Sequence, residues 1–309
     1  MNFFKPKFWD KNKISFFSIL LFPISLFIKI LNFFRRLLIK TKQCSIPVIC
    51  VGNIYLGGTG KTPLCIKIFS ILKEMGMNPA IIRKKYNDFE DEADLQKKVG
   101  PFYQNKKRFL AIEEAKKNKI NVAILDDGFQ DLSIKKNLSI VCFNEKQWVG
   151  NGLMIPAGPL REDLSSLDRA DFVFINGSKN SSIEEKILKE NKKIKFFYTN
   201  IKAQNINDFK NKNVIAFAGI GTPEKFFNTL KDHKINVLKE IKFPDHHKYS
   251  HEELENLVLE KKENNAVLIT TEKDYFRIKE NIKENISYLK IKVEIQNQDS
   301  FIQEIKKII

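Results

Sequence analysis

One short segment constrains the fold of this chain more than any other. Residues 52–62 read GNIYLGGTGKT, directly after the apolar run IPVICV and directly before a helical pattern. Glycines let backbone N–H groups converge on phosphate oxygens, the lysine can reach the β- and γ-phosphates, and the threonine hydroxyl can bind Mg²⁺. The strict motif has glycine at position 55, but the GGTGKT core and its context still predict a nucleotide-binding loop between a strand and a helix. The residues expected to bind ATP are Tyr55, Leu56, Gly57, Gly58, Thr59, Gly60, Lys61 and Thr62.

A second apolar run ends in two carboxylates. Residues 120–125 read INVAIL, and Asp126 and Asp127 follow at once. Ligands of open α/β sheets bind at the carboxyl ends of the strands, and phosphate-loop proteins hold Mg²⁺ through an aspartate placed there. We therefore expect one or both aspartates to hold Mg²⁺ with Thr62, directly or through water. The alternative is that one of them only caps the N-terminus of a helix.

Short apolar runs alternate with amphipathic stretches over most of the chain. The runs are continuous, which is typical of strands buried on both faces of a parallel sheet. The pattern predicts an α/β fold with a doubly wound, mostly parallel sheet, followed by a second, smaller α/β domain. The expected domains are 44–205, which binds the nucleotide, and 206–309, which would close over the site. The expected strands are 46–51, 78–82, 120–125, 138–143, 171–175, 194–198, 214–218, 267–270 and 287–293, and the expected helices include 62–75, 224–233 and 251–263.

The composition excludes several classes of protein. Hydrophobic residues make up 43% of the 309 positions, enough for a packed core, so global disorder and collagen-like folds are excluded. The four cysteines form no C-x-x-C pair and lie in or beside apolar runs. We therefore expect the reduced thiols of a cytosolic protein, neither zinc ligands nor disulfides.

Residues 1–43 are predicted to form a membrane-associating helix. Residues 14–28 carry no charge, and this stretch is shorter than the roughly 20 residues that span a bilayer. Polar residues recur mostly at spacings of three, four or seven and form one narrow stripe, opposite a face of Phe, Leu and Ile. We expect a helix kinked at Pro23 that lies in the membrane interface, with its basic residues near anionic headgroups. A spanning anchor, a core helix and a cleaved signal peptide are the alternatives.

The net charge of +16 also points to the membrane surface. Residues 1–42 carry nine basic side chains and one acidic side chain, so they hold +8 of that charge. This charge lies beside an apolar helix and not in a groove interleaved with aromatic residues. An anionic membrane is therefore the expected partner, and nucleic acid is not.

Six motifs follow one another along the chain: VGNIYLGGTGKTP, ILDDGFQD, GNGLMIPAGPLRE, FAGIGTPEKFF, FPDHHKYS and TTEKD. In this set the chain resembles the tetraacyldisaccharide 4′-kinases of the lipid A pathway, from the N-terminal helix to about residue 295. The resemblance implies transfer of the γ-phosphoryl group of ATP to the 4′-hydroxyl of a tetraacylated glucosamine disaccharide 1-phosphate, with Mg²⁺. It also implies a site on the cytoplasmic side of the inner membrane, where the N-terminal helix would meet the lipid substrate.

The resemblance assigns roles residue by residue. Arg161 of PAGPLRE would neutralise phosphate charge in the transition state, and Glu162 would hold the metal or orient Arg161. His246 of the DH dipeptide would pair with the catalytic base. The remaining matches are Lys61, Thr62, Asp126, Asp127 and Gln130.

The region of the expected base departs from the family pattern. The family's G-D-E-P element reads EDEA at 90–93, which makes Asp91 the candidate base. The family's S-R-G-Y element reads RKKY, so Lys84 would replace a bidentate arginine with a point charge. Asp131 stands where the family commonly has histidine. Because Asp91 and His246 belong to different predicted domains, they would meet only when the cleft between the domains closes.

Other functions share parts of this pattern. A membrane-associated switch ATPase of the partitioning type shares GG-x-GKT and a basic amphipathic helix, but it carries a lysine where this chain has Leu56. A nucleic-acid-binding ATPase is suggested only by the net charge. A zinc site at His246, His247 and His251 lacks a further suitably spaced ligand.

Overall fold

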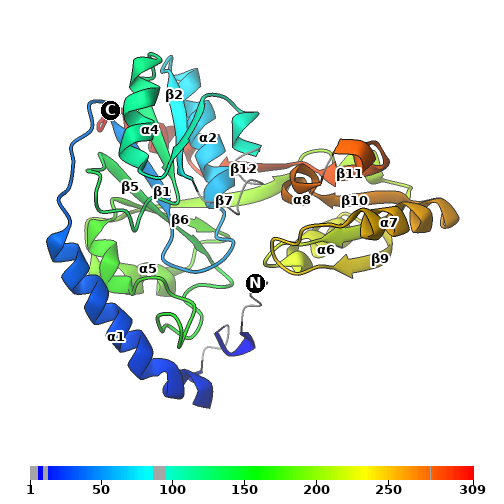
Figure 1. The fold of residues 1–309 in the computed structure, drawn as a ribbon, viewed down its shortest axis with the longest axis horizontal. Coiled ribbons are helices and arrows are strands. Elements are labelled where there is room, and N and C mark those ends of the chain that lie inside the picture. The colour runs from blue at the N-terminus through cyan, green and yellow to red at the C-terminus, as the bar shows by residue number, and fades with distance from the viewer. Residues whose placement is uncertain (1–5, 10–12, 86–94, 279) are drawn as a thin grey trace. The chain divides into compact units, whose positions relative to one another are not determined.

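The computed structural model describes residues 6–9, 13–85, 95–278 and 280–309, which form two compact units. The larger unit holds Pro6–Tyr86, Val99–Asn200 and Val293–Ile309. The smaller unit holds Ile201–Lys292 and a short segment that ends at Lys98. Each unit is an α/β structure with its own sheet, as the sequence predicts (Figure 1).

An eight-stranded sheet forms the centre of the larger unit. Its strands are β1 (Val48–Gly52), β2 (Pro79–Lys84), β3 (Phe102–Asn105), β4 (Val122–Asp126), β5 (Leu138–Asn144), β6 (Phe172–Asn176), β7 (Lys195–Ala203) and β12 (Ile291–Ile295). The order is β12-β7-β6-β5-β1-β4-β2-β3, and the pairs from β7 to β3 are parallel. Because β1 pairs with β4 in parallel, the phosphate loop and the two aspartates both follow the carboxyl ends of neighbouring strands.

Helices cover both faces of this sheet, so the predicted doubly wound arrangement is confirmed. One face packs against α2 (Lys61–Glu74) and α9 (Gln298–Lys306), and the other against α4 (Arg108–Lys117) and α5 (Ser181–Glu190). The 3₁₀ helix η2 (Leu164–Arg169) precedes β6. α2 ends at Glu74, one residue before the predicted end at 75. Gly76 follows with a φ of 80°, and the N–H of Met77 donates to the oxygen of Leu72 at 3.0 Å.

The C-terminal end of the chain belongs to the larger unit, which differs from the predicted domain of 206–309. Phe301 and Ile305 of α9 are fully buried. Phe301 packs edge-on against Phe174 and Phe197, with ring centroids 5.0 and 5.2 Å away. This burial of aromatic surface holds residues 293–309 on the larger unit. The predicted strand of 287–293 is correspondingly divided between two sheets.

A four-stranded parallel sheet forms the centre of the smaller unit. Its strands are β8 (Asn213–Ala218), β9 (Asn236–Lys242), β10 (Val267–Thr271) and β11 (Ile286–Leu289), in the order β11-β10-β8-β9. One face packs on α6 (Pro223–Asp232) and the other on α7 (His251–Glu263). α7 begins with a capping box formed by Ser250 and Glu253. The remaining elements are α8 (Glu272–Arg277), η1 (Lys7–Trp9), η3 (Ile206–Phe209) and η4 (Glu280–Asn285).

The N-terminal helix α1 (Phe16–Leu38) belongs to the larger unit (Figure 1). Residues of its polar stripe contact the rest of that unit. Ser25 is buried; it donates from Oγ to the oxygen of Met154 (2.9 Å) and accepts from the N–H of Ala157 (3.0 Å). Lys29 pairs with Asp163 at 2.5 Å. The polar stripe is therefore present as predicted, but its residues contact other parts of the larger unit. The phenylalanines and leucines of the opposite face are exposed. By length and composition alone, α1 is apolar enough to cross a membrane.

The four cysteines are free, as expected. Cys50, Cys65 and Cys142 are buried in the core of the larger unit, and burial raises the pKa of Cys50 to about 11 and of Cys142 to about 12. These thiols are therefore protonated at neutral pH and unreactive.

Candidate active site

A buried asparagine holds the phosphate loop. Asn53 is fully buried, and its side-chain amide donates to the backbone oxygen of Tyr55 (2.6 Å) and to Oγ1 of Thr59 (3.0 Å). Gln130 donates from Nε2 to the backbone oxygen of Asn53 at 2.8 Å, so the matched glutamine supports the loop. Gly60, immediately before α2, has a φ of 91°, a left-handed conformation that glycine adopts without strain. A loop held in this way loses little conformational entropy when it binds phosphate.

The PAGPLRE segment lies alongside the phosphate loop. The N–H of Arg161 donates to the oxygen of Ile54 at 2.7 Å, and Tyr55 forms an antiparallel bridge with Leu160. Tyr55, which replaces the glycine of the strict motif, is fully buried in the core. The departure at position 55 therefore anchors the loop through a buried ring.

Asp126, the last residue of β4, lies in space beside the first turn of α2. It is 1% exposed, and its Oδ2 accepts from Thr62 Oγ1 at 3.4 Å. Arg83 Nη1 lies 4.0 Å from the same oxygen, and Cys65 Sγ lies 3.5 Å from Oδ1. The carboxylate thus lies beside the threonine hydroxyl that the motif predicts as a Mg²⁺ ligand.

Asp127 has different neighbours from Asp126. Arg161 donates from Nη1 to both of its oxygens, at 2.8 and 2.9 Å, and Lys61 Nζ lies 3.6 Å from Oδ1. Burial opposes ionisation of this carboxyl, but Lys61 and Arg161 outweigh it and hold the pKa well below its usual range. Asp127 is therefore a fixed anion that positions the two cations expected to meet phosphate.

This lowered pKa predicts a specific pH dependence of stability. A carboxylate whose pKa is depressed by folding stabilises the fold fully above its unfolded pKa of about 3.9, and that stabilisation is lost as the pH falls through the folded pKa. We expect the free energy of unfolding of the wild type to fall more steeply between pH 5 and pH 2 than that of Asp127→Asn. Urea titrations of both proteins across this range measure the difference, and parallel pH profiles would contradict it.

Arg108 is a site residue that the sequence analysis missed. It is 5% exposed and donates from Nη2 to the backbone oxygens of Asp127 (2.7 Å) and Asp126 (3.4 Å). Its Nη1 pairs with Asp131 at 3.1 Å, so the residue in place of the family's histidine holds this arginine. No motif marks Arg108, because the pairing of strands, and not the nearby sequence, brings α4 to the two aspartates.

Glu162 has partners that differ from its expected role. Its oxygens pair with Arg36 of α1 at 2.5 Å and with Arg169 of η2 at 2.8 Å, and it is 7% exposed. Both carboxylate oxygens are therefore engaged by guanidinium groups. The geometry favours a link between α1 and the Arg161 segment over metal binding.

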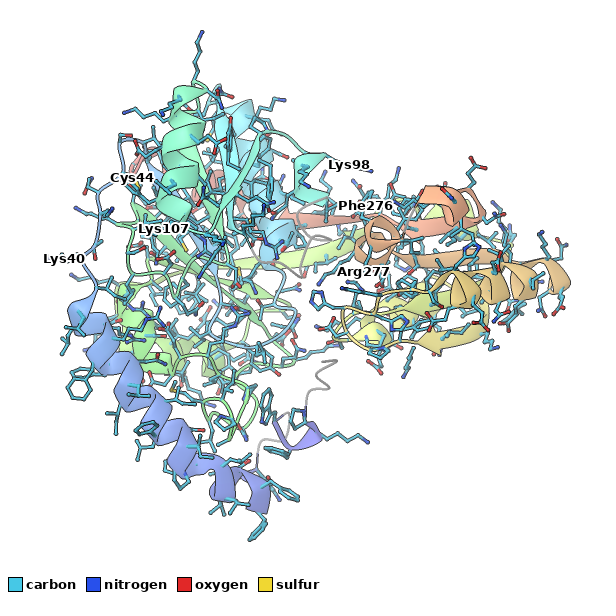
Figure 2. All side chains as sticks on the ribbon, in the orientation of Figure 1. Lys40, Cys44, Lys98, Lys107, Phe276 and Arg277 are labelled. Atoms are coloured by element: carbon cyan, nitrogen blue, oxygen red, sulfur yellow. The ribbon has the colours of Figure 1, made fainter. Side chains whose placement is uncertain are left out.

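In the smaller unit, the AGIG, DHH and TTEKD motifs meet around a buried aspartate. Asp274 is fully buried and accepts from the N–H of Gly219 (3.1 Å) and from Oγ1 of Thr271 (2.7 Å). Arg277, labelled in Figure 2, pairs with Asp274 at 3.0 Å and donates to the oxygen of Gly219 at 3.0 Å. The N–H of His246 also donates to the oxygen of Gly219, at 3.0 Å. The backbone around His246 is thus fixed by buried hydrogen bonds.

The His246 ring lies among polar side chains. Its Nε2 lies 3.4 Å from Lys273 Nζ and 3.9 Å from Asp245 Oδ1. Its side chain is 32% exposed. The ring can therefore be reached from solvent.

The two remaining predicted site residues are Asp91 and Lys84. Asp91 lies outside the described residues. Lys84 is exposed at the end of β2, whereas its neighbour Arg83 is 8% exposed beside Asp126. Within the described residues, no three His, Cys, Asp or Glu side chains group as a metal site would require, and the alternative zinc site at the histidines gains no support.

Known proteins are similar to this chain over almost its whole length. A family model described as LpxK, tetraacyldisaccharide-1-P 4′-kinase, matches residues 17–309. A tetraacyldisaccharide 4′-kinase of Pelagibacter ubique is 41% identical over 309 residues, and one of Rickettsia bellii is 35% identical over 319 residues; each match covers 98% of both chains. The crystal structure of LpxK from Aquifex aeolicus in complex with ATP has a TM-score of 0.73 at 25% identity, covering 94% of this chain and 99% of that one.

Proposed function

The chain belongs to the tetraacyldisaccharide 4′-kinase family, and from that premise we propose how its residues carry out the reaction. It transfers the γ-phosphate of ATP to the 4′-hydroxyl of tetraacyldisaccharide 1-phosphate, a step of lipid A biosynthesis. One observation carries the proposal for the site. Lys61 and Arg161 contact Asp127, and Thr62 contacts Asp126. These contacts bring the expected groups together at the carboxyl ends of β1 and β4.

The phosphates of ATP bind to the loop of residues 55–62. The loop is held by Asn53 and by the PAGPLRE segment, so its N–H groups need little rearrangement. Lys61 and Arg161 supply positive charge where negative charge develops on the transferred phosphoryl group. Asp127 holds both cations in place, and Arg108 holds the backbone of Asp127.

The donor set beside the loop fits Mg²⁺. Thr62 Oγ1 and Asp126 Oδ2 lie 3.4 Å apart, so both can reach one small cation, and Mg²⁺ sites commonly use one or two protein oxygens with phosphates and waters. When bound, the ion neutralises charge on the β- and γ-phosphates. Asp127 is engaged by Arg161 and would reach the ion through water, and Glu162 is engaged by two other arginines.

The Mg²⁺ site predicts a change in metal requirement. We expect Thr62→Ala to raise the Mg²⁺ concentration for half-maximal activity about tenfold, because one ligand is lost. Ser70→Ala, which removes a hydroxyl farther along α2, is the matched control and should leave the requirement unchanged. Titration of Mg²⁺ after removal of metal with EDTA measures both. An unchanged requirement in Thr62→Ala would contradict the assignment.

The proton of the acceptor hydroxyl requires a base. On the motif match we propose that Asp91 accepts this proton and that His246 raises its basicity. The ring of His246 is a third exposed and its backbone is fixed, which supports a role in proton transfer. Positioning and charge stabilisation provide most of the catalysis of phosphoryl transfer, so these residues should matter less than Lys61.

We also propose that α1 attaches the enzyme to the cytoplasmic face of the inner membrane. Its polar stripe is occupied by contacts with the larger unit, while Phe27, Phe33 and Phe34 are each more than half exposed. A helix with one face on protein and one exposed apolar face suits a monotopic position, where that face enters the acyl region. The acylated substrate lies in the same layer.

Transfer of radiolabelled phosphate from ATP to tetraacyldisaccharide 1-phosphate in detergent tests the function. The expected result is a bis-phosphorylated lipid whose formation requires Mg²⁺. ATP hydrolysis without a lipid product would overturn the proposal and favour a switch ATPase of the partitioning type.

A further inference from the structure

A tight turn in the smaller unit contains His246. The turn lies in the loop between the end of β9 and the start of α7 (Figure 1). The N–H of His247 donates to the oxygen of Pro244 at 3.1 Å, which closes a turn over residues 244–247. His246 is the third residue of this turn and has a φ of 59°. Glycine or asparagine is usual where a turn needs a positive φ, so a histidine at this position is strained.

Strain of this kind persists only where neighbouring contacts hold the backbone. On one side of the turn, the N–H of His246 donates to the oxygen of Gly219 at 3.0 Å. Arg277 donates to the same oxygen at 3.0 Å and to the oxygen of His247 at 3.3 Å. Gly219 follows β8 and Arg277 ends α8, so the buried part of the smaller unit fixes this side.

The side chain of His247 holds the other side of the turn. Its Nε2 lies 3.0 Å from both carboxylate oxygens of Glu253, and because an ionised carboxylate only accepts, the ring donates. Glu253 lies in the first turn of α7, where it also accepts from the N–H of Ser250 at 2.8 Å. The ring of His247 stacks on that of Phe243, with centroids 4.8 Å apart. His247 therefore connects the turn both to the residue after β9 and to α7.

The two adjacent histidines have different surroundings. The side chain of His247 is 17% exposed, and its ring contacts the rings of Phe243 and Tyr249. The side chain of His246 is 32% exposed. His247 is thus largely enclosed by its own loop and by α7, so its contacts act on the backbone of the turn.

We propose that His247, through its hydrogen bond to Glu253, is a positioning residue for His246. This bond keeps the backbone of His246 in its left-handed conformation and so fixes where the ring of His246 lies. The inference rests on the proposed function, in which His246 takes part in proton transfer, and adds the residues that hold it. A misplacement of about 1 Å can lower a rate up to about 10²-fold, so loosening this turn should slow turnover.

The first test is kinetic. His247→Ala should lower kcat for lipid phosphorylation about tenfold and leave the KM for ATP unchanged, because the phosphate loop belongs to the larger unit. His247→Gln keeps an N–H donor of similar reach to Glu253 and should recover most of kcat. The matched control is His251→Ala, which removes an exposed histidine at the start of α7 and should keep wild-type kcat.

A double variant separates positioning from general support of the fold. His246→Ala alone should lower kcat about 10²-fold, the lower end of the usual contribution of a proton-transfer residue. If His247 acts through His246, adding His247→Ala to this variant should cause no further loss. A further tenfold loss in the double variant would overturn the proposal.

The second test is NMR of the ring of His246 in protein labelled with ¹³C-histidine. The chain has four histidines, so single substitutions assign each ring signal. The His246 signal should move in Glu253→Ala, which leaves both rings of the turn in place. It should stay in Glu253→Gln, because glutamine removes the same charge but keeps an acceptor and the capping box. An unmoved His246 signal in Glu253→Ala would contradict the proposal.

The NMR experiment needs no kinase activity, so the two possible failures are distinguishable. A signal that moves as expected, together with wild-type kcat in His246→Ala, would remove the proton-transfer role of His246 and support its positioning by Glu253 and His247.

Discussion

Replacing Lys61 with alanine should lower kcat/KM for lipid phosphorylation about 10³-fold, the scale on which a transition-state cation acts in phosphoryl transfer. Lys61 is the first residue of α2, and its ammonium lies 3.6 Å from Asp127 at the edge where the loop leaves the sheet. The variant loses the charge that meets the β- and γ-phosphates. Initial rates of lipid phosphorylation at varied ATP concentrations measure the effect.

The control for this prediction lies on the same helix. Lys73→Ala removes an exposed lysine near the end of α2, so its kcat/KM should stay within about twofold of the wild type, as expected of surface substitutions. Circular dichroism of both variants checks that the fold is retained. A Lys61→Ala enzyme with more than a tenth of wild-type kcat/KM would remove Lys61 from the proposed role.

Arg161→Ala should lower kcat by about 10²-fold, the usual cost of losing one preorganised donor to a developing charge. Arg161 Nη1 donates hydrogen bonds to both oxygens of Asp127, at 2.8 and 2.9 Å. Its backbone N–H bonds to Ile54, and that bond survives the substitution. The loop should therefore stay in place, and the loss should appear in kcat more than in the KM for ATP.

Arg161→Lys separates geometry from charge. Lysine keeps the positive charge but replaces the rigid, planar guanidinium with a flexible point charge, so we expect it to recover little activity. Lys179→Ala, an exposed cation before α5, is the control and should behave as wild type. Wild-type kcat in Arg161→Lys would show that a point charge is sufficient at this position.

The buried strands were predictable because their signal is local. β1, β4, β5 and β6 are buried on both faces along nearly their whole length, so each appears in the sequence as an unbroken apolar run. Two strands escaped detection, β3 and β9. Both lie at a sheet edge, and β9 is largely exposed, so neither needs such a run.

The polar stripe of α1 was predicted correctly, but its basic residues contact other groups than the expected lipid headgroups. Its spacing predicted the faces of the helix, and the exposed phenylalanines and leucines confirm them. The partner of the stripe was not predictable. Lys29 and Arg36 pair with Asp163 and Glu162, carboxylates that lie far away in the sequence and arrive only through folding.

The sequence by itself determined the phosphate loop, the acidic pair after β4 and the doubly wound sheet, because each depends on residue types within one strand–loop–helix segment. Only the tertiary structure decided which carboxylate meets which cation. Arg161 lies 34 positions from Asp127, and Arg36 lies 126 positions from Glu162. Such pairs are set by strand order and by the docking of α1. They cannot be predicted from the residues next to each partner in the chain. For that reason Asp126 and Asp127, adjacent and alike in sequence, have different neighbours in the folded protein.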